Sequence, residues 1–498
     1  MTITRLSLAV NCAVLMCVFS LPAIAQNFGK LFTVDTVSDT VDAAPGDSFC
    51  ADASGRCSLR AAIQEANVTP NTRDAVIFSL PNPSVIDLTL GELAVTGRLA
   101  IVGPGARRLT IERSFAAGTP DSRVFRFAAG ATNSVLRGLK IKNGNASDIG
   151  GGLLIEAGAV VTATDLWING NRSGKGGGVA NAGNMTISRS LIDSNEVGVA
   201  NTGERGGGIA NLTAQSTLKI INSTVTANRG NTSGAIDNAG TLTLVHVTLA
   251  GNFASDSCTT MCNLPGGTIT LINSLIGPDT EAPARSALSG SFTSLGNNIV
   301  TDARGTSGFT NGVNGDQVSD MNAIDPLLGP LSNNGGETDT LPLLTGSVAI
   351  DHGNPCVSNG NCPSLGFILI RSDQRSGYFR GFFSPVDIGA FEFNAPHGSS
   401  SSSFGFFAVN QPAFFGGSIS VATNATTGEK VYSANNPFGR MRLQNLPGGV
   451  WILELRTKRA SVGTDPSVVS SEDAPPISLA SPGINIVVEQ GKPKLDGR

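Results

Sequence analysis

Residues 174–195 read GKGGGVANAGNMTISRSLIDSN, and parts of this stretch return further along the chain. Three glycines, two apolar residues and an asparagine occupy 176–181 and again 206–211, and a looser copy, SGAIDN, occupies 233–238. Glycine accepts positive φ angles and lets backbones approach closely, so it suits tight corners. Repeated corners separated by short apolar runs are typical of a solenoid, in which each coil is stabilised by its neighbours.

Alignment of the copies on the asparagine that ends each apolar run gives intervals of 24, 33 and 24 residues. Within a copy the first two apolar positions are two residues apart, which is the period of a β-strand rather than a helix. Leucine-rich and propeller repeats fit less well, because these copies lack the leucine pattern and the four strands per repeat. We therefore predict an all-β chain whose main part is a right-handed parallel β-helix, similar to the pectin-lyase-like solenoids.

The alignment predicts which side chains stack inside this solenoid. Stacked asparagines can pair with one another and with corner backbone groups that would otherwise lack hydrogen bonds. The predicted asparagine stacks are Asn171, Asn195, Asn228 and Asn252, and Asn181, Asn211 and Asn238. The predicted apolar columns are Val161, Met185, Leu218 and Leu242; Ala163, Ile187, Ile220 and Leu244; and Ile168, Ile192, Val225 and Leu249.

The N-terminus has the features of a secretory signal peptide. One cationic residue, Arg5, precedes an apolar run, and the run ends in a small-x-small exit with cleavage expected after Ala25. An uncleaved anchor is the alternative, and no later segment is apolar over enough residues to span a bilayer. We expect residues 26–498 to be secreted, either extracellular or at the cell surface, with the periplasm as the alternative location.

Cysteine spacing agrees with export. Cys12 and Cys17 lie in the leader, and zinc is the alternative for the other six, but their spacings differ and the three histidines fit no zinc-finger pattern. Disulfides are favoured in an oxidising compartment. The expected pairs are Cys50–Cys57, Cys258–Cys262 and Cys356–Cys362.

A candidate N-terminal cap of the solenoid lies within about residues 45–70. Its segment CSLRAAIQEAN, at 57–67, places apolar residues at helical spacing after a possible N-cap, Ser58. It resembles the CSLREA-type module that precedes glycine- and asparagine-rich β-helix repeats, similar to those of polymorphic outer-membrane proteins. Those modules carry glutamate where this chain has Ala61, so the capping box is incomplete. The expected buried face is Leu59, Ala62, Ile63 and Ala66.

The end of the solenoid resembles a second known module. The motifs DPLLGP (325–330), NNGGET (333–338), GSVAID (346–351), DQR (373–375) and DIGAFE (387–392) are similar to a choice-of-anchor Q domain. The resemblance implies that about 290–395 close a β-helix covering 26–395, with repeats at about 95–300. We expect the Asp and Arg residues to tie the last coil to its closing loops by charge-assisted hydrogen bonds.

After Phe393 the composition changes. Residues 396–404 form a serine-rich linker, and 405–498 contain short alternating segments at 418–422, 440–443 and 450–455. Its motifs NPFGR (436–440), NLPGG (445–449) and WILEL (451–455) resemble those of a carboxypeptidase-regulatory-like β-sandwich, which implies a small module without catalytic activity.

One polar column offers candidate catalytic residues. In the alignment Asp165, Arg189, Asn222 and His246 share a position, so they are expected to lie on neighbouring coils. Asp165, Arg189 and His246 are the candidates, because lyases use a basic residue and hydrolases use carboxylates. A ladder of corner residues is the alternative, with His246 at a surface or corner position. The remaining carboxylates of the repeats are Asp148, Asp193, which we expect to be solvated, and Asp237.

Two functional hypotheses follow. The first is a non-enzymatic, adhesin-like or envelope-associated protein, expected to be monomeric, that presents a long surface to an extracellular glycan or surface protein. The second is a polysaccharide lyase or glycoside hydrolase acting on the polar face, for which Ca²⁺ would be a possible cofactor. Otherwise no cofactor or metal is expected. The net charge of −4 and the lack of a basic stripe argue against a nucleic-acid partner.

Overall fold

The structure is a computed structural model that describes residues 29–198, 205–256, 258–278, 286–320, 323–360, 362, 365, 370–381 and 385–395. It also describes the backbone of seven strands between 419 and 496. The predicted signal peptide (1–25) and the linker (396–404) lie outside the described residues. No helix of the described part is long and apolar enough to cross a membrane.

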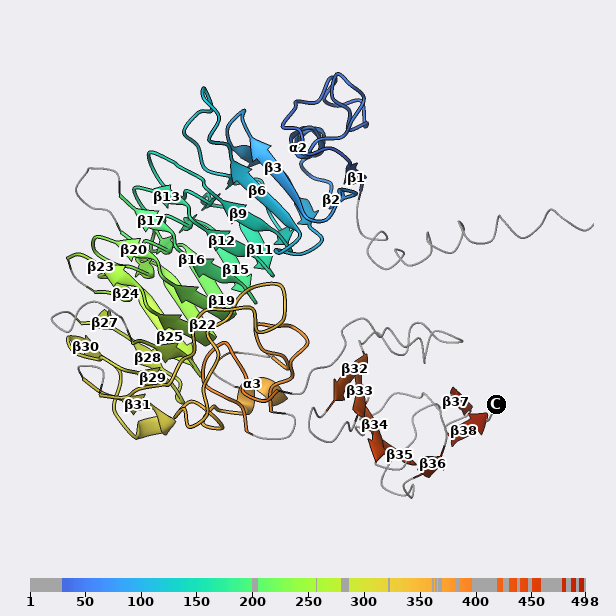
Figure 1. Cartoon of the computed structure of the whole chain (residues 1–498), viewed down its shortest axis with the longest axis vertical. Coiled ribbons are helices and arrows are strands. Elements are labelled where there is room, and N and C mark those ends of the chain that lie inside the picture. Colours follow the sequence, from blue (N-terminus) through green and yellow to red (C-terminus); the bar gives the residue numbers. More distant parts are fainter. Residues whose placement is uncertain are drawn as a thin grey trace, which may run out of the picture.

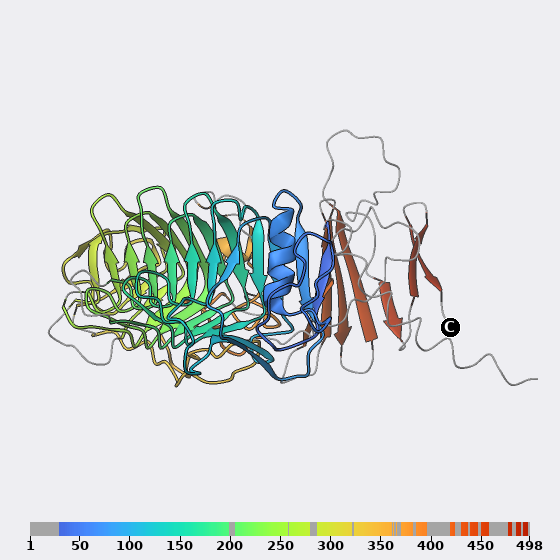
Figure 2. The ribbon, with the colours of Figure 1, turned by 90° about the horizontal axis from the view of Figure 1, so that it is seen from above.

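The main body is a parallel β-helix, as predicted. Successive coils add strands to the same sheets, and the strands of each sheet pair in parallel register, so they form rows when seen from above (Figure 2). In the described residues the largest sheet has two tracks, joined because β19 and β22 each run through both. The first track is β1 (Leu31–Val34), β2 (Asp74–Phe78), β5 (Leu99–Val102), β8 (Ser134–Arg137), β11 (Val160–Thr164), β15 (Asn184–Ser188), β19 (Thr217–Thr226), β22 (Thr241–Ala250), β25 (Thr268–Ile272) and β28 (Thr293–Ser294).

The second track lies beyond a bend in each coil. It contains β3 (Ser84–Leu88), β6 (Leu109–Arg113), β9 (Lys140–Lys142), β12 (Trp167–Asn169) and β16 (Leu191–Asp193), then the second halves of β19 and β22, and then β26 (Leu275–Ile276), β29 (Ile299–Val300) and β31 (Gln317–Val318). Between β30 and β31 the chain forms the short helix η1 (Val313–Gly315).

Two smaller sheets complete the solenoid in the described residues, one of nine strands and one of four, so the smaller one is present in only some of the coils. The second sheet, which we call sheet B, contains β4 (Leu93–Val95), β7 (Phe125–Phe127), β10 (Leu153–Ile155), β14 (Val179–Asn181), β18 (Ile209–Asn211), β21 (Ile236–Asn238), β24 (Met261–Asn263), β27 (Leu288–Ser291) and β30 (Thr306–Ser307). The third contains β13 (Arg172–Ser173), β17 (Glu196–Val197), β20 (Arg229–Gly230) and β23 (Phe253–Ala254).

The predicted columns form the core. Met185 pairs in register with Val161 on one side and Leu218 on the other, and the other two apolar columns stack in the same way. The asparagine stacks are also confirmed. Asn195 accepts from the backbone N–H and side-chain amide of Asn171, and it donates to Asn228 at 3.0 Å. Buried corner groups are thereby paired, as buried polar groups require.

Helix α2 (Leu59–Val68) lies at one end of the rows of strands, as expected for a cap (Figure 2). Ser58 is its N-cap, and the Ser58 hydroxyl accepts from the Ala61 N–H at 3.0 Å. The predicted apolar face is buried, and Ala61 and Glu65 are buried with it. Glu65 pairs its carboxylate with two backbone N–H groups, those of Gly46 and Ser48.

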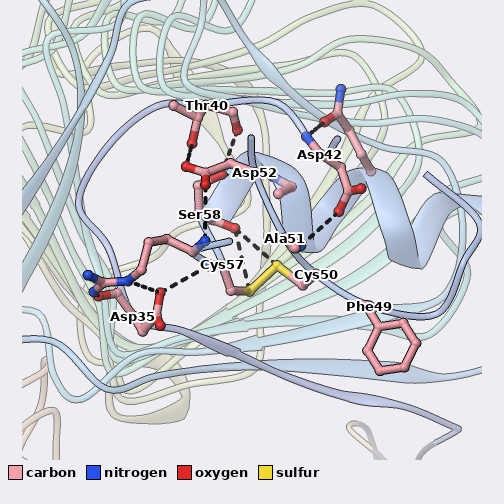
Figure 3. Close-up of a disulfide and its surroundings, with 12 residues drawn as sticks. Asp35, Thr40, Asp42, Phe49, Cys50, Ala51, Asp52, Cys57 and Ser58 are labelled. Carbon is pink, nitrogen blue, oxygen red and sulfur yellow. Dashed lines mark hydrogen bonds and ion pairs between the residues drawn. A yellow bond between two sulfur atoms is a disulfide. The ribbon is translucent and has the colours of Figure 1, made fainter. Parts of the chain in front are cut away.

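The three predicted disulfides are present, with Cα–Cα distances of 5.0, 5.8 and 4.9 Å. Figure 3 shows Cys50–Cys57 beside the start of α2. There the Cys57 N–H donates to Asp35, and the Ser58 hydroxyl donates to the Thr40 carbonyl at 2.6 Å. The disulfide and these bonds fix the loop that enters the helix.

Residues 323–395, which we call the covering segment, close the molecule differently from the prediction. They contain α3 (Cys356–Asn359), and Figure 1 shows them folded back beside the coils that carry β19 and β22. Their contacts reach from Gln317, through Thr248 and Thr224, to Arg107, which pairs with Asp339 at 2.6 Å. The Asp and Arg motifs are expected to tie the last coil to its closing loops, whereas these contacts run along the side of the solenoid as far as the early coil that carries Arg107.

The C-terminal part contains strands, as predicted. β32 (Ile419–Thr423), β33 (Lys430–Asn436), β34 (Gly439–Leu446), β35 (Val450–Thr457) and β36 (Ile477–Ala480) pair into an antiparallel sheet, and β37 (Asn485–Glu489) pairs with β38 (Lys492–Asp496). Whether the two sheets pack as a sandwich remains a prediction, because the side chains of these strands lie outside the described residues.

Candidate functional site

The four residues of the predicted polar column occupy the bend between the two tracks. All four have φ angles between 44° and 55°, in the left-handed region. Asparagine and aspartate tolerate this conformation best after glycine, whereas Arg189 and His246 adopt it at a cost. The same bend is occupied by Gly138 in an earlier coil and by Asn273 and Asn297 in later coils. The column is thus first of all a ladder of corner residues.

The early half of the column is an ion-pair cluster. Arg189 forms a bidentate pair with Asp165, with its Nε 2.8 Å from Oδ1 and its second nitrogen 3.0 Å from Oδ2. Arg137 reaches Oδ2 of the same carboxylate from the preceding coil at 3.1 Å. The Asp165 side chain is buried, so its oxygens are occupied by two guanidinium groups. A carboxylate held in this way is a poor nucleophile or base.

The later half of the column is closed off by the covering segment. Asn222 donates to the Ser372 carbonyl at 2.6 Å and accepts from Arg380 at 3.1 Å. His246 is fully buried, so its expected surface position is wrong, although it is a corner residue. The side-chain amide of Asn273 donates to His246 Nε2 at 3.0 Å. Burial, with the charge of Arg380 as a smaller cause, holds the pKa of His246 well below its ordinary value.

The structure therefore stacks all three catalytic candidates in one column without bringing them together at an open site. Asp165 and Arg189 neutralise each other, and His246 lies two coils beyond Arg189 beneath the covering segment. Within the described residues no group of three or more His, Cys, Asp or Glu side chains could hold a metal ion. The Asp351–His352 pair of the terminal motif is exposed, and the His352 backbone carbonyl accepts from Asn297.

Asp193 is not solvated, contrary to expectation. It lies on β16, only 5% exposed, and accepts from the Trp167 indole at 2.7 Å and from Asn169 at 2.9 Å. Burial raises the pKa of Asp193 despite these bonds. The Trp167 ring has the Lys140 ammonium 3.6 Å from its centroid and the Arg107 guanidinium at 5.7 Å. The Trp167 side chain is therefore occupied by contacts within the protein, and Arg107, one of its neighbours, also pairs with Asp339 of the covering segment.

Asp237 has a different environment from every carboxylate above. It lies on β21 of sheet B, 5% exposed, and its Oδ1 has no hydrogen-bond partner among the described residues. Burial raises the pKa of Asp237 to about 6, and the charges of Arg205 and Lys175 oppose that rise. A buried acceptor without a partner is uncommon in native proteins and needs a reason.

One face of the solenoid remains open. Outward side chains of the first track form two columns, mostly of hydroxyl residues, that are half-buried or exposed. Asn184 carries an amide, and Lys219 is the one charged member among the described residues. We call this set the threonine face. Its members are Thr162, Thr186, Lys219, Thr243, Thr270 and Thr293 in one column, and Asn184, Thr217, Thr241 and Thr268 in the other.

The threonine face and the unusual position of Asp237 could both have been found in the sequence, although the alignment did not use them. The T-x-T pattern at 241–243 and 268–270 places two hydroxyls on one strand face, which the period of two makes predictable. Asp237 replaces the alanine found at the matching position of the two preceding copies, Ala180 and Ala210. The partners of Asp193 and Asn222 could not be found in this way, because they belong to other coils and to the covering segment.

Comparison with known proteins adds one structural match. No family model and no curated protein matches the chain. Among solved structures, the crystal structure of pectate lyase Pel9A matches at 16% sequence identity with a TM-score of 0.29, covering 73% of this chain and 96% of that chain. The assignment of a parallel β-helix rests on the strand pairing of this chain itself.

Proposed function

We propose that this chain is an exported β-helix protein that binds extracellular glycans on the sides of its solenoid and does not turn them over. The observation that carries the proposal is the closure of the polar column: Asp165 is paired with two arginines, and His246 is buried beneath the covering segment. An acid–base pair for glycoside cleavage must face its substrate and exchange protons with it. Side chains held in this way serve the architecture.

The threonine face supports binding of a glycan in particular. Hydroxyl and amide side chains both donate and accept hydrogen bonds, as sugar hydroxyls do. The face has one charged residue in the described columns, so it offers little to a strongly charged partner. Strands stack about 4.8 Å apart, so the hydroxyls repeat regularly along the solenoid. A repeating polar surface suits an extended polymer that makes many weak contacts.

The proposal is tested with the purified mature chain and a panel of neutral and acidic polysaccharides, measuring binding and released product together. We expect binding without product. The variant Thr243→Glu puts a charge into the threonine face and should weaken binding of neutral glycans at least tenfold. Thr310→Glu, at an exposed residue outside the face, is the matched control and should have no effect. Product formation that Asp165→Ala abolishes would overturn the proposal.

A further inference from the structure

Exposed apolar side chains gather at the N-terminal end of the solenoid. Among the described residues ten large apolar side chains are exposed, and eight of them lie between residues 31 and 115. This stretch contains β1, α2 and the first strands of the second track, at the end of the rows where α2 lies (Figure 2). Single exposed apolar residues are ordinary on a protein surface, whereas a group of them marks a surface with a partner. The eight are Leu31, Val37, Val41, Phe49, Val68, Val85, Leu90 and Phe115.

Four of these side chains surround the loop at Asp39. The Asp39 carboxylate accepts from the Leu90 N–H at 2.8 Å. Val37 and Val41 lie two residues before and after Asp39 in the sequence. Phe115 adjoins Leu90, because β3 and β6 pair in parallel register and end two residues before each of them. We call Val37, Val41, Leu90 and Phe115 the apolar patch.

The charges beneath the apolar patch are already paired. The Arg60 guanidinium of α2 contacts both oxygens of Asp39, at 2.7 and 3.1 Å, and the two side chains are 11% and 2% exposed. Thr89 and Leu90 donate their N–H groups to the same carboxylate. A partner of the apolar patch therefore meets apolar side chains rather than a free charge, which suits an uncharged segment that would lose hydration of few polar groups.

The chain itself contains a segment of matching composition. Residues 404–415 read FGFFAVNQPAFF, with five phenylalanines and no charged side chain in twelve residues. They connect the linker after the covering segment to β32. Aromatic side chains carry a large apolar surface, whose removal from water is favourable wherever another apolar surface is offered.

The length of the chain allows these two regions to meet. Phe393 of the covering segment packs against a cluster that contains Leu275 of β26. Along the second track β26 lies six strands beyond β6, which precedes Phe115. Six spacings of about 4.8 Å correspond to about 29 Å. Residues 394–404 can span about 36 Å when extended, so residues 404–415 can reach the apolar patch of their own chain.

We propose that residues 404–415 dock on the apolar patch of the same chain and hold the C-terminal strands beside the first coils. Attachment through a short linker keeps the segment at a high effective concentration near the patch, and a second molecule lacks this advantage. The contact is independent of glycan binding, and it assigns a partner to a surface that the proposed function does not use.

Limited digestion of the full mature chain with chymotrypsin, which cuts after accessible phenylalanines, tests the contact. Cleavage between 404 and 415 is followed by mass spectrometry. Phe115→Asp puts a charge into the apolar patch and should speed this cleavage by about tenfold or more, because the undocked segment becomes the main species. Val313→Asp is the matched control and should leave the rate unchanged. Val313 is an exposed apolar residue of η1, just before β31, at the opposite end of the solenoid from α2 (Figure 1).

A variant on the other side of the contact makes the test reciprocal. Replacing Phe406 and Phe407 together by serine should uncover the apolar patch and raise the fluorescence of a dye that binds apolar surfaces. Adding Phe115→Asp to this double variant should lower the dye fluorescence again. Leu90→Asp should reproduce the effect of Phe115→Asp on cleavage. Because both patch residues are exposed, an unchanged melting temperature separates loss of docking from a folding defect.

Three outcomes would overturn the proposal. The first is equally fast cleavage of the wild-type chain and of Phe115→Asp. The second is protection that rises with protein concentration together with dimers in sedimentation, because the segment would then dock on a second copy. The third is protection that appears only after phosphatidylcholine vesicles are added, which would assign both regions to a membrane surface.

Discussion

The covering segment and strand β21 both contain buried carboxylates, but the hydrogen bonding of these carboxylates differs. Glu392 accepts from Arg380, Asp387 N–H and Gly381 N–H, so its oxygens are fully used. Asp237 has an oxygen with no partner in the described residues. Satisfied buried networks hold a structure together, whereas an unsatisfied group destabilises it and needs another explanation. The contrast separates carboxylates that stabilise this fold from one that destabilises it.

The largest effect is expected from breaking the satisfied network. Arg380 contacts Asn222, Glu392 and the carbonyls of Asp387 and Gly389, and its side chain is fully buried. Arg380→Leu should destabilise the docked covering segment by about 4 kcal/mol, because it leaves a buried carboxyl without its partner. Hydrogen exchange of the amides at 387–392 measures this change.

The control for that experiment is an exposed ion pair. Arg137 pairs with Asp165, but its side chain is 55% exposed. Arg137→Leu should therefore change stability by less than about 1 kcal/mol. Equal effects of the two substitutions would mean that the Arg380 network does not hold the covering segment in place.

The next largest effect should be a dependence of stability on pH. Burial raises the pKa of Asp387 to about 6 and that of Glu392 to about 8, against the opposing charge of Arg380. Because these values are raised, the folded state holds the protons more tightly than the unfolded chain does. The stabilisation is complete below about pH 4 and is lost as the pH rises through 6 to 8. The rise of about two pKa units at Asp387 alone corresponds to about 3 kcal/mol, and the larger rise at Glu392 adds to it.

This loss is measured as exchange of the 387–392 amides between pH 5 and 8, corrected for the intrinsic exchange rate. Glu392→Gln carries no titrating proton and should flatten the dependence while keeping the shape of the side chain. An unchanged slope in this variant would assign the pH dependence to other groups.

A smaller effect is expected in the asparagine ladder, which is satisfied but uncharged. Asn195 donates to the Ile168 carbonyl and accepts from the Asn171 N–H, so Asn195→Ala leaves buried backbone groups unpaired. The expected loss of unfolding free energy is about 2 kcal/mol by chemical denaturation. Asn184→Ala, at an exposed position of β15, is the matched control and should change stability by less than about 0.5 kcal/mol.

The ladder also shows what could be predicted from sequence. The columns through Met185 and Asn195 follow from a local period and a repeat length, and both appear in one alignment of the chain with itself. The motifs identify the covering segment in the sequence, but they do not predict its position along the side of the solenoid. Thr224 meets Gln374 across 150 residues of sequence, and no local period specifies such a contact. The burial of Asp193 could not be predicted either, because its partner Trp167 lies on the preceding coil.

The smallest effect should come from His246, which tests whether an unpaired atom alone marks a site. Its Nδ1 has no hydrogen-bond partner in the described part of the chain, as is the case for Asp237 Oδ1, and the backbone of Asp387 and Gly389 lies beside the ring. The flanking corner residues, Asn222 and Asn273, have the same left-handed conformation. His246→Asn should therefore change stability by less than about 1 kcal/mol, because asparagine suits that conformation and regains part of the lost hydrogen bonding.

The same variant should leave binding of every glycan unchanged, because the covering segment lies between His246 and the solvent. Calorimetry with the glycans of the panel, run beside Thr243→Glu, makes the comparison direct. If His246→Asn weakened binding as much as Thr243→Glu, burial beneath the covering segment would not separate structural groups from ligand-binding groups. If only Thr243→Glu weakens binding, the threonine face identifies the binding site, and an unpaired buried atom by itself does not.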